Sequence, residues 1–153
     1  MFQLFFPILE KEHYYLLCAD FETGRLEIIY NSASTESAAN KYGDTIDNEY
    51  FKREGEPFKA GQCMNLATKR MQMKWRDHMN KIDCGVYLMR HMESYCGEGV
   101  NRWVCGLKKG DRSELNSLRL HYIKEIFTSD VNTHRTSNVA RALAFHARSS
   151  AGT

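Results

Sequence analysis

A cysteine at the start of a predicted helix is the residue of this chain best suited to chemistry. Cys84 lies where the polar segment Asn80–Asp83 gives way to residues spaced along one helical face, namely Leu88, Met92, Tyr95 and Cys96. Asp83 is a candidate N-cap, and Gly97 can end the helix in a left-handed turn. Free N–H groups and the helix dipole at this end favour a thiolate, which is the nucleophilic form of cysteine. The pattern predicts a nucleophile, and a small buried hydrophobic cysteine is the alternative interpretation.

A thiol nucleophile needs a base, a group that orients the base, and hydrogen-bond donors for the oxyanion. His13 opens a predicted strand beside a loop, where its side chain can reach a cleft. Asn31 ends the partner strand, so its amide can orient the imidazole, and a turn-forming asparagine is the alternative. The other histidines fall in a polar loop, on predicted helices or in the C-terminal segment: His78, His91, His121, His134 and His146.

Strands predominate in the N-terminal third. Phe2–Leu9 is almost continuously apolar, which predicts a strand covered on both faces. His13–Asp20 and Arg25–Asn31 flank the turn signal Glu22–Gly24 and predict a hairpin. Further along, three apolar residues alternate with polar ones and predict a half-buried strand: Met71, Met73 and Trp75.

The predicted helices lie mostly in the second half of the chain. Residues 32–40 predict a loop or weak helix, and residues 44–53 a short helix. A longer helix is expected from about Ser113, with an apolar stripe of Leu115, Leu118, Tyr122 and Ile126. We therefore expect an α+β fold, with one domain over residues 1–135 and a weakly ordered tail over 136–153.

Composition excludes several classes of protein. The 153 residues carry a net charge of only +2, which gives no argument for a nucleic-acid or membrane partner. No apolar run is long enough to span a bilayer, and the apolar N-terminus lacks the features of a signal peptide. The cysteines form no C-x-x-C motif, which argues against a disulfide scaffold or structural zinc site and for a reducing compartment: Cys18, Cys63, Cys84, Cys96 and Cys105.

The chain resembles the ubiquitin-like-protein-specific cysteine proteases, the SUMO (sentrin) protease or Ulp-like family that includes the adenovirus protease. It looks most similar to divergent plant members. The segments that carry this resemblance occur in the family's order: Phe6–Ile8, His13–Tyr14, Tyr30–Ser32, His78–Asn80 and Asp83–Gly85. Trp103–Gly106 and Leu118–Tyr122 also look like the C-terminal part of the plant members, so the resemblance covers roughly residues 2 to 135.

The resemblance implies a papain-like or adenain-like core, with a small mixed or antiparallel sheet packed against helices. It implies that His13 is the base, Asn31 takes the orienting position and Cys84 is the nucleophile. It further implies that His78 and the backbone N–H of Cys84 form the oxyanion hole, while Asp83 orders the preceding loop. It implies no cofactor and no metal, and a nuclear or cytoplasmic location.

The implied activity is a cysteine peptidase or isopeptidase that cleaves after the Gly-Gly tail of a ubiquitin-like modifier such as SUMO, on the modifier or its conjugates. The tail would lie beside His13, Trp75 and Cys84, and core packing is the alternative for Trp75. The family has aspartate at the position of Asn31 and glutamine at that of His78, and these two differences predict slower chemistry. The family's domain also begins upstream of this Met1, so the chain is expected to lack the first part of the domain.

Two other functions remain open from the sequence. A weakened or inactive domain could bind a modifier or another protein without turnover. Acyl transfer such as acetylation is a third hypothesis, but the short basic cluster Lys108–Lys109 is separated in sequence from Cys84.

Overall fold

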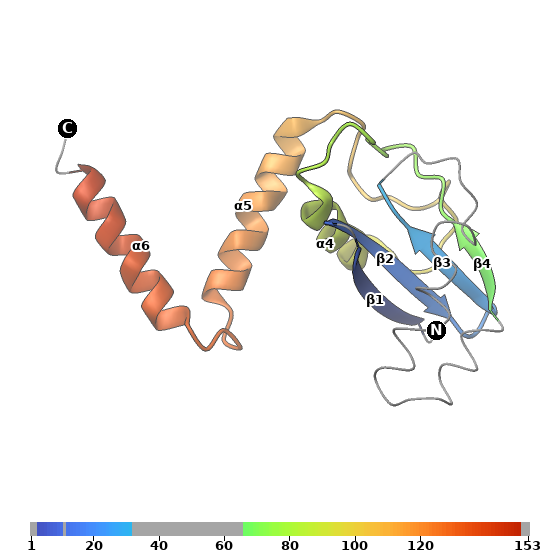
Figure 1. The fold of residues 1–153 in the computed structure, drawn as a ribbon, viewed down its shortest axis with the longest axis horizontal. Coiled ribbons are helices and arrows are strands. Elements are labelled where there is room, and N and C mark those ends of the chain that lie inside the picture. Colours follow the sequence, from blue (N-terminus) through green and yellow to red (C-terminus); the bar gives the residue numbers. More distant parts are fainter. Residues whose placement is uncertain (1–2, 11, 32–65, 151–153) are drawn as a thin grey trace. The chain divides into compact units, whose positions relative to one another are not determined.

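The computed structural model describes residues 3–10, 12–31 and 66–150 of the chain (Figure 1). Within these residues the fold is α+β, with a mixed four-stranded sheet and three helices, in agreement with the predicted class. The chain divides into two compact units, Met1–Asp111 and Arg112–Thr153. The sheet and the helix that begins at Cys84 belong to the first unit.

The sheet has the strand order β1-β2-β3-β4, which is also the order in the chain. Its strands are β1 (Gln3–Glu10), β2 (His13–Asp20), β3 (Arg25–Ile29) and β4 (Ala67–Arg70). β1, β2 and β3 are antiparallel neighbours, whereas β4 pairs with β3 in parallel. The predicted β2–β3 hairpin is confirmed.

The β2–β3 turn is fixed by one side chain and one glycine. Asp20 Oδ1 accepts hydrogen bonds from the backbone N–H groups of Glu22 and Thr23, both at 3.0 Å. Gly24 then adopts a φ of +66°, a conformation that costs little without a Cβ. Burial alone would raise the pKa of Asp20, but the hydrogen bonds to its carboxylate outweigh burial and lower it. These contacts explain why the turn signal in the sequence was reliable.

The prediction for the first strand was right in position and wrong in burial. β1 pairs only with β2 in the described sheet, so it is an edge strand. Leu9 is 59% exposed and Pro7 is also exposed, while Ile8 is buried. A continuous apolar run predicted cover on both faces, but one face of β1 is partly open.

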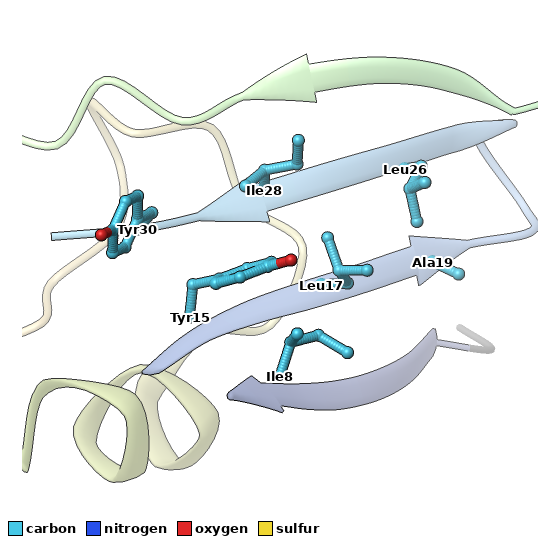
Figure 2. Packing of buried hydrophobic residues seen from close by; sticks show 7 residues of the cluster. All are labelled: Ile8, Tyr15, Leu17, Ala19, Leu26, Ile28 and Tyr30. Atoms are coloured by element: carbon cyan, nitrogen blue, oxygen red, sulfur yellow. The ribbon is translucent and has the colours of Figure 1, made fainter. Parts of the chain in front are cut away.

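One face of the sheet carries the apolar cluster drawn in Figure 2. Alternate residues of β2 and of β3 point to this face, as the two-residue period of a strand requires. Phe6, Phe21 and Leu66 are partly buried against it. The cluster consists of Ile8, Tyr15, Leu17, Ala19, Leu26, Ile28 and Tyr30.

Helix α4 (Cys84–Ser94) packs on β2 and covers the opposite face of the sheet. At its start, a Cβ on Gly85 would lie 4.0 Å from the ring of Tyr14. Just beyond its end, the Tyr95 hydroxyl donates a hydrogen bond to the buried carboxylate of Glu27. Both contacts fix the helix along the sheet.

The predicted helical stripe was correct only in part. The helix ends at Ser94, because Tyr95 is already extended with φ −88° and ψ 125°. Gly97 has the left-handed φ of +86° that was expected, but it lies in the loop after the helix. Leu88 is buried, whereas Met92 and Cys96 are exposed.

An aromatic cluster packs behind α4. The Trp103 ring lies 4.9 Å from Trp75, 5.3 Å from His91 and 4.7 Å from Tyr95, measured between centroids. Trp75 Nε1 donates to His91 Nε2 at 3.1 Å. Burial lowers the pKa of His91 to about 3, so this histidine is neutral in the folded protein at ordinary pH.

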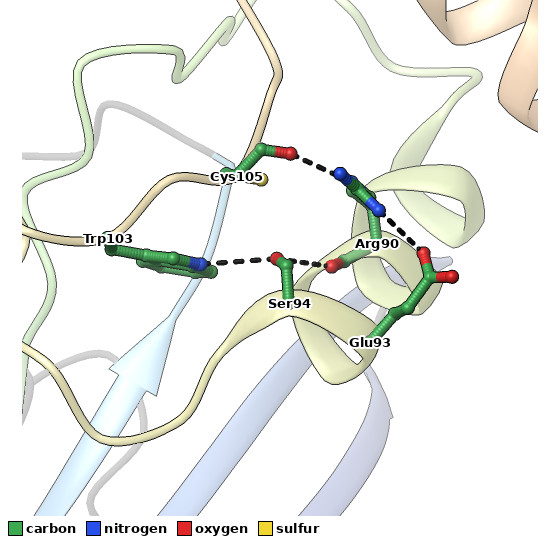
Figure 3. Close-up of polar contacts among 5 residues, drawn as sticks. All are labelled: Arg90, Glu93, Ser94, Trp103 and Cys105. Atoms are coloured by element: carbon green, nitrogen blue, oxygen red, sulfur yellow. Dashed lines mark hydrogen bonds and ion pairs between the residues drawn. The ribbon is translucent and has the colours of Figure 1, made fainter.

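Hydrogen bonds tie the following loop to α4 (Figure 3). Trp103 Nε1 donates to Ser94 Oγ at 3.1 Å, and Ser94 Oγ donates to the Arg90 carbonyl at 2.7 Å. Arg90 Nε donates to the carbonyl oxygen of Cys105 at 2.7 Å, and its Nη1 pairs with Glu93. The loop therefore belongs to the same packed unit as the helix.

The segment Met71–Trp75 is not a strand, contrary to prediction. β4 ends at Arg70, and the Met71 N–H makes one further bond to the Ile28 carbonyl. The alternation itself is real, since Met71, Met73 and Trp75 are buried while the residues between them are exposed. Alternating burial therefore occurs here in a segment without regular strand structure.

The second unit contains helices α5 (Arg112–Thr128) and α6 (Arg135–Ser150). Three residues of the predicted α5 stripe are buried, namely Leu115, Leu118 and Tyr122, but Ile126 is 55% exposed. α6 occupies most of the segment expected to be a weakly ordered tail, and none of its residues is buried. The predictions for residues 32–40 and 44–53 lie outside the described residues, and no described helix is long and apolar enough to span a membrane.

Candidate active site

The hairpin places two of the predicted site residues at one end of the two inner strands, β2 and β3. β2 and β3 are antiparallel, and Leu16 pairs with Ile29. The beginning of β2 and the end of β3 therefore lie side by side. His13 is the first residue of β2, and Asn31 follows β3 by two residues. The strand pattern that predicted the hairpin is thus sufficient to bring these residues close together.

The start of α4 lies at the same end of these strands. Tyr14, the neighbour of His13, lies against Gly85, the neighbour of Cys84. Cys84 is the first residue of the helix and is half-buried. Its position matches the prediction of a thiol in the first helical turn.

A pocket of about 120 Å³ joins these elements. His13, Asn31, His78 and Cys84 all line it, so the structure brings together every residue predicted for the catalytic and oxyanion sites. Their catalytic roles remain a prediction. The other lining residues are Tyr30, Asp77, Asn80 and Lys81.

His13 sits beside the Tyr30 ring, and His78 is exposed at the pocket. The two rings of His13 and Tyr30 are 6.5 Å apart between centroids and meet edge to face. His78, from the loop before α4, presents a second imidazole that can donate to an oxyanion.

The Asn31 side chain is held by the backbone of Asp77. Asn31 Nδ2 donates to the Asp77 carbonyl at 3.0 Å, and the Asp77 N–H donates to Asn31 Oδ1 at 3.0 Å. Asn31 is 6% exposed. In the described structure this buried amide therefore bonds to the loop and not to the imidazole of His13. The two contacts join segments 46 positions apart in the chain.

The loop before Cys84 is ordered by Asn80. Its Nδ2 donates to Asp83 Oδ2 at 2.7 Å, and its Oδ1 accepts the Asp83 N–H at 3.0 Å. Asp83 occupies the N-cap position, as predicted, but its side chain makes no capping hydrogen bond. The predicted part of Asp83 in ordering the loop agrees with these contacts, which fix the approach to Cys84.

A tyrosine lies beneath the pocket. The Tyr87 hydroxyl is buried close to the Asn31 side chain. Burial, together with the negative charges of Asp77 and Asp83, raises the pKa of Tyr87 to about 12. Tyr87 is therefore a neutral phenol in the folded protein at ordinary pH.

Cys84 differs in surroundings from the other described cysteines. Burial, with the charges of Glu27 and Asp20, raises the pKa of Cys18 to about 12, and burial also raises that of Cys105. Cys96 is exposed but does not line the pocket. Among the described cysteines only Cys84 is both accessible and next to histidines.

The sequence pattern assigned no role to Asp77 or Lys81, and for Trp75 it left a place beside the substrate tail and a place in the core as alternatives. Asp77 and Lys81 lie in the polar loop before α4, seven and three positions before Cys84. Their closeness to Cys84 in the sequence was the signal that could have indicated them. Trp75 does not line the pocket and packs in the aromatic cluster, so the core alternative is the correct one.

No protein-family model, curated protein or solved structure matches the chain. Within the described residues, no group of three or more histidine, cysteine, aspartate or glutamate side chains is arranged to hold a metal ion.

Proposed function

We propose that this chain carries a thiol peptidase site of the Ulp-like type, in a papain-like or adenain-like core. The observation that supports the proposal most directly is the shared pocket of His13, His78 and Cys84 beside Asn31. A nucleophile, a base and an oxyanion donor are the minimum set for acyl transfer by a thiol. The three side chains proposed for these roles come from β2, from the loop before α4 and from the start of α4.

The proposed substrate is the extended Gly-Gly tail of a ubiquitin-like modifier such as SUMO, free or conjugated. Glycine has no Cβ, so its backbone can pass through a narrow site. The proposal places this tail along the pocket lined by His13, His78 and Cys84. Such a substrate accords with the expected nuclear or cytoplasmic location and needs no cofactor, nucleic acid or membrane.

The chemistry follows from the atoms in the pocket. His13 takes the proton of Cys84 Sγ, and the sulfur bonds to the scissile carbonyl carbon. The backbone N–H of Cys84 and the imidazole N–H of His78 donate to the resulting oxyanion. The C–N bond then breaks, and His13 returns the proton to the leaving amine. Water, deprotonated by His13, adds to the thioester carbonyl, the C–S bond breaks, and the modifier leaves with a new carboxyl group. His13 returns the proton to Cys84 Sγ, so the starting thiol is restored.

A binding domain without turnover is the second candidate. The uncharged Asn31, engaged with the Asp77 backbone, favours it, because such an amide cannot balance an imidazolium charge. In this case a modifier would still occupy the pocket, and the thiol would not react with its carbonyl.

A fluorogenic amide on the Gly-Gly terminus of a SUMO-type modifier separates the two candidates. Wild type and Cys96→Ser, the matched control at an exposed cysteine, are expected to release the fluorophore, whereas Cys84→Ser is expected to lose at least about 10³-fold in rate. Fluorophore release that is equal in Cys84→Ser refutes the peptidase proposal. Saturable binding of the modifier without release by wild type supports the binding candidate.

A further inference from the structure

The pocket contains one carboxylate to which sequence analysis gave no role. Of the described side chains that line it, Asp77 alone carries a negative charge. Its Oδ1 accepts the Met79 N–H at 3.1 Å, which turns the side chain within its own loop. Asp77 lines the same pocket as His13 and Cys84.

The contacts of Asn31 explain how Asp77 is held there. Two hydrogen bonds of 3.0 Å join the buried Asn31 amide to the N–H and the carbonyl of Asp77. An amide that bonds both groups of one residue fixes the direction of that residue's Cα–Cβ bond. Asn31 therefore holds the backbone of Asp77 in place. The negative charge among the described residues that line the pocket belongs to Asp77 and not to Asn31.

We propose that Asp77 is a positioning residue that stabilises the imidazolium form of His13, with Asn31 as its backbone clamp. This inference rests on the proposed function. A negative group beside the pair stabilises the imidazolium, and Asp77 lines the same pocket as His13. Asp77 supplies a full charge, which the neutral amide of Asn31 does not.

Other charged and titratable groups face the same pocket, and their effects have defined signs. Lys81 and a protonated His78 oppose a second positive charge on His13. Asp83, the buried carboxylate at the start of α4, acts in the same sense as Asp77, and Tyr87 is a neutral phenol without charge. Since Lys81 is exposed, solvent screens it more strongly than the half-buried Asp77. The described lining groups are His13, Tyr30, Asn31, Asp77, His78, Asn80, Lys81 and Cys84.

The test measures the rate of Cys84 alkylation by iodoacetamide against pH, resolved by mass spectrometry, in the full chain. Asp77→Asn keeps a side-chain oxygen for the Met79 N–H and removes only the charge. We expect alkylation of Cys84 to be about tenfold slower at about pH 6.5 and unchanged above about pH 9, where a thiol ionises without help. A purely structural role would slow the reaction equally at both pH values.

Two further variants complete the test. Asp77→Glu restores the charge and is expected to recover part of the rate at low pH. Glu22→Gln removes an exposed carboxylate at the other end of β2 and should leave the rate unchanged. Because β2 spans about 3.3 Å per residue, that charge is far from the pocket.

The outcomes distinguish this inference from the proposed function. If His13→Ala slows Cys84 alkylation but Asp77→Asn leaves it unchanged or accelerates it, the assignment of Asp77 is overturned and the peptidase site stands. If His13→Ala itself has no effect, the proposed function fails, and the assignment of Asp77 fails with it.

Discussion

The buried His91 predicts a strong loss of stability as the pH falls. In the folded chain its pKa is about 3, because burial disfavours the charged ring, and its Nε2 accepts the Trp75 N–H. In the unfolded chain a histidine has a pKa of about 6.5. Between these two values the unfolded state binds one more proton than the folded state, so acid favours unfolding. The contribution of His91 is fully present above about pH 6.5 and is lost as the pH falls toward 3.

The magnitude follows from the separation of the two pKa values. Each pH unit in this window changes the free energy of unfolding by about 1.36 kcal/mol for one proton. From about pH 6.5 to about pH 5, His91 alone should therefore remove about 2 kcal/mol, a large part of the stability of a small domain. His91→Gln removes the titrating ring and keeps an oxygen that can accept from Trp75.

Urea unfolding followed by tryptophan fluorescence, at about pH 6.5 and about pH 5, measures the effect. Wild type should lose about 2 kcal/mol more than His91→Gln between these conditions, whatever their difference at the higher pH. His121→Gln, at an exposed position, is the control for the loss of a histidine. Equal pH dependence in wild type and His91→Gln would show that His91 is not buried as a neutral acceptor.

Two substitutions test the packing around the ends of the sheet, each by urea unfolding. Gly97→Ala should cost about 1–2 kcal/mol, because its φ of +86° disfavours any residue with a Cβ. Gly24→Ala, with φ +66° and no atom within 4 Å of the new Cβ, is the matched case and should cost a similar amount, since the Gln3 side chain beside Gly97 can move aside. No loss of stability in either variant would contradict the left-handed conformation of these glycines. Tyr95→Phe should cost about 1–3 kcal/mol, because it leaves the buried Glu27 carboxylate without its donor. A change below about 0.5 kcal/mol would mean that Glu27 is solvated.

Local patterns predicted those parts of the fold that depend on neighbouring residues. The hairpin of β2 and β3 follows from two β-rich runs around a Gly-containing turn, and the start of α4 follows from the switch to helical spacing at Cys84. The open face of β1 could not be predicted, because an apolar run does not show what packs on each face of the strand. Met71–Trp75 could not be assigned either, because alternating burial does not show whether the backbone pairs with a neighbouring strand.

The candidate site shows the same division. His13 and Cys84 could be predicted from their places at element ends, and the structure brings both to one pocket. The clamp between Asn31 and Asp77 could not, because it joins residues 46 positions apart and uses backbone groups that every residue type carries. An asparagine at a strand end indicated a polar partner but not which one.

The central claim is that His13 and Cys84 form a reactive pair. The measurement that tests it most directly is the iodoacetamide alkylation rate of Cys84 at about pH 6.5 in wild type and in His13→Ala, with the exposed Cys96 as internal reference. The account predicts that Cys84 reacts at least about tenfold faster than Cys96 in wild type, and that His13→Ala removes the difference. Equal rates for Cys84 and Cys96 in wild type, or a rate for Cys84 that is unaffected by His13→Ala, would contradict it.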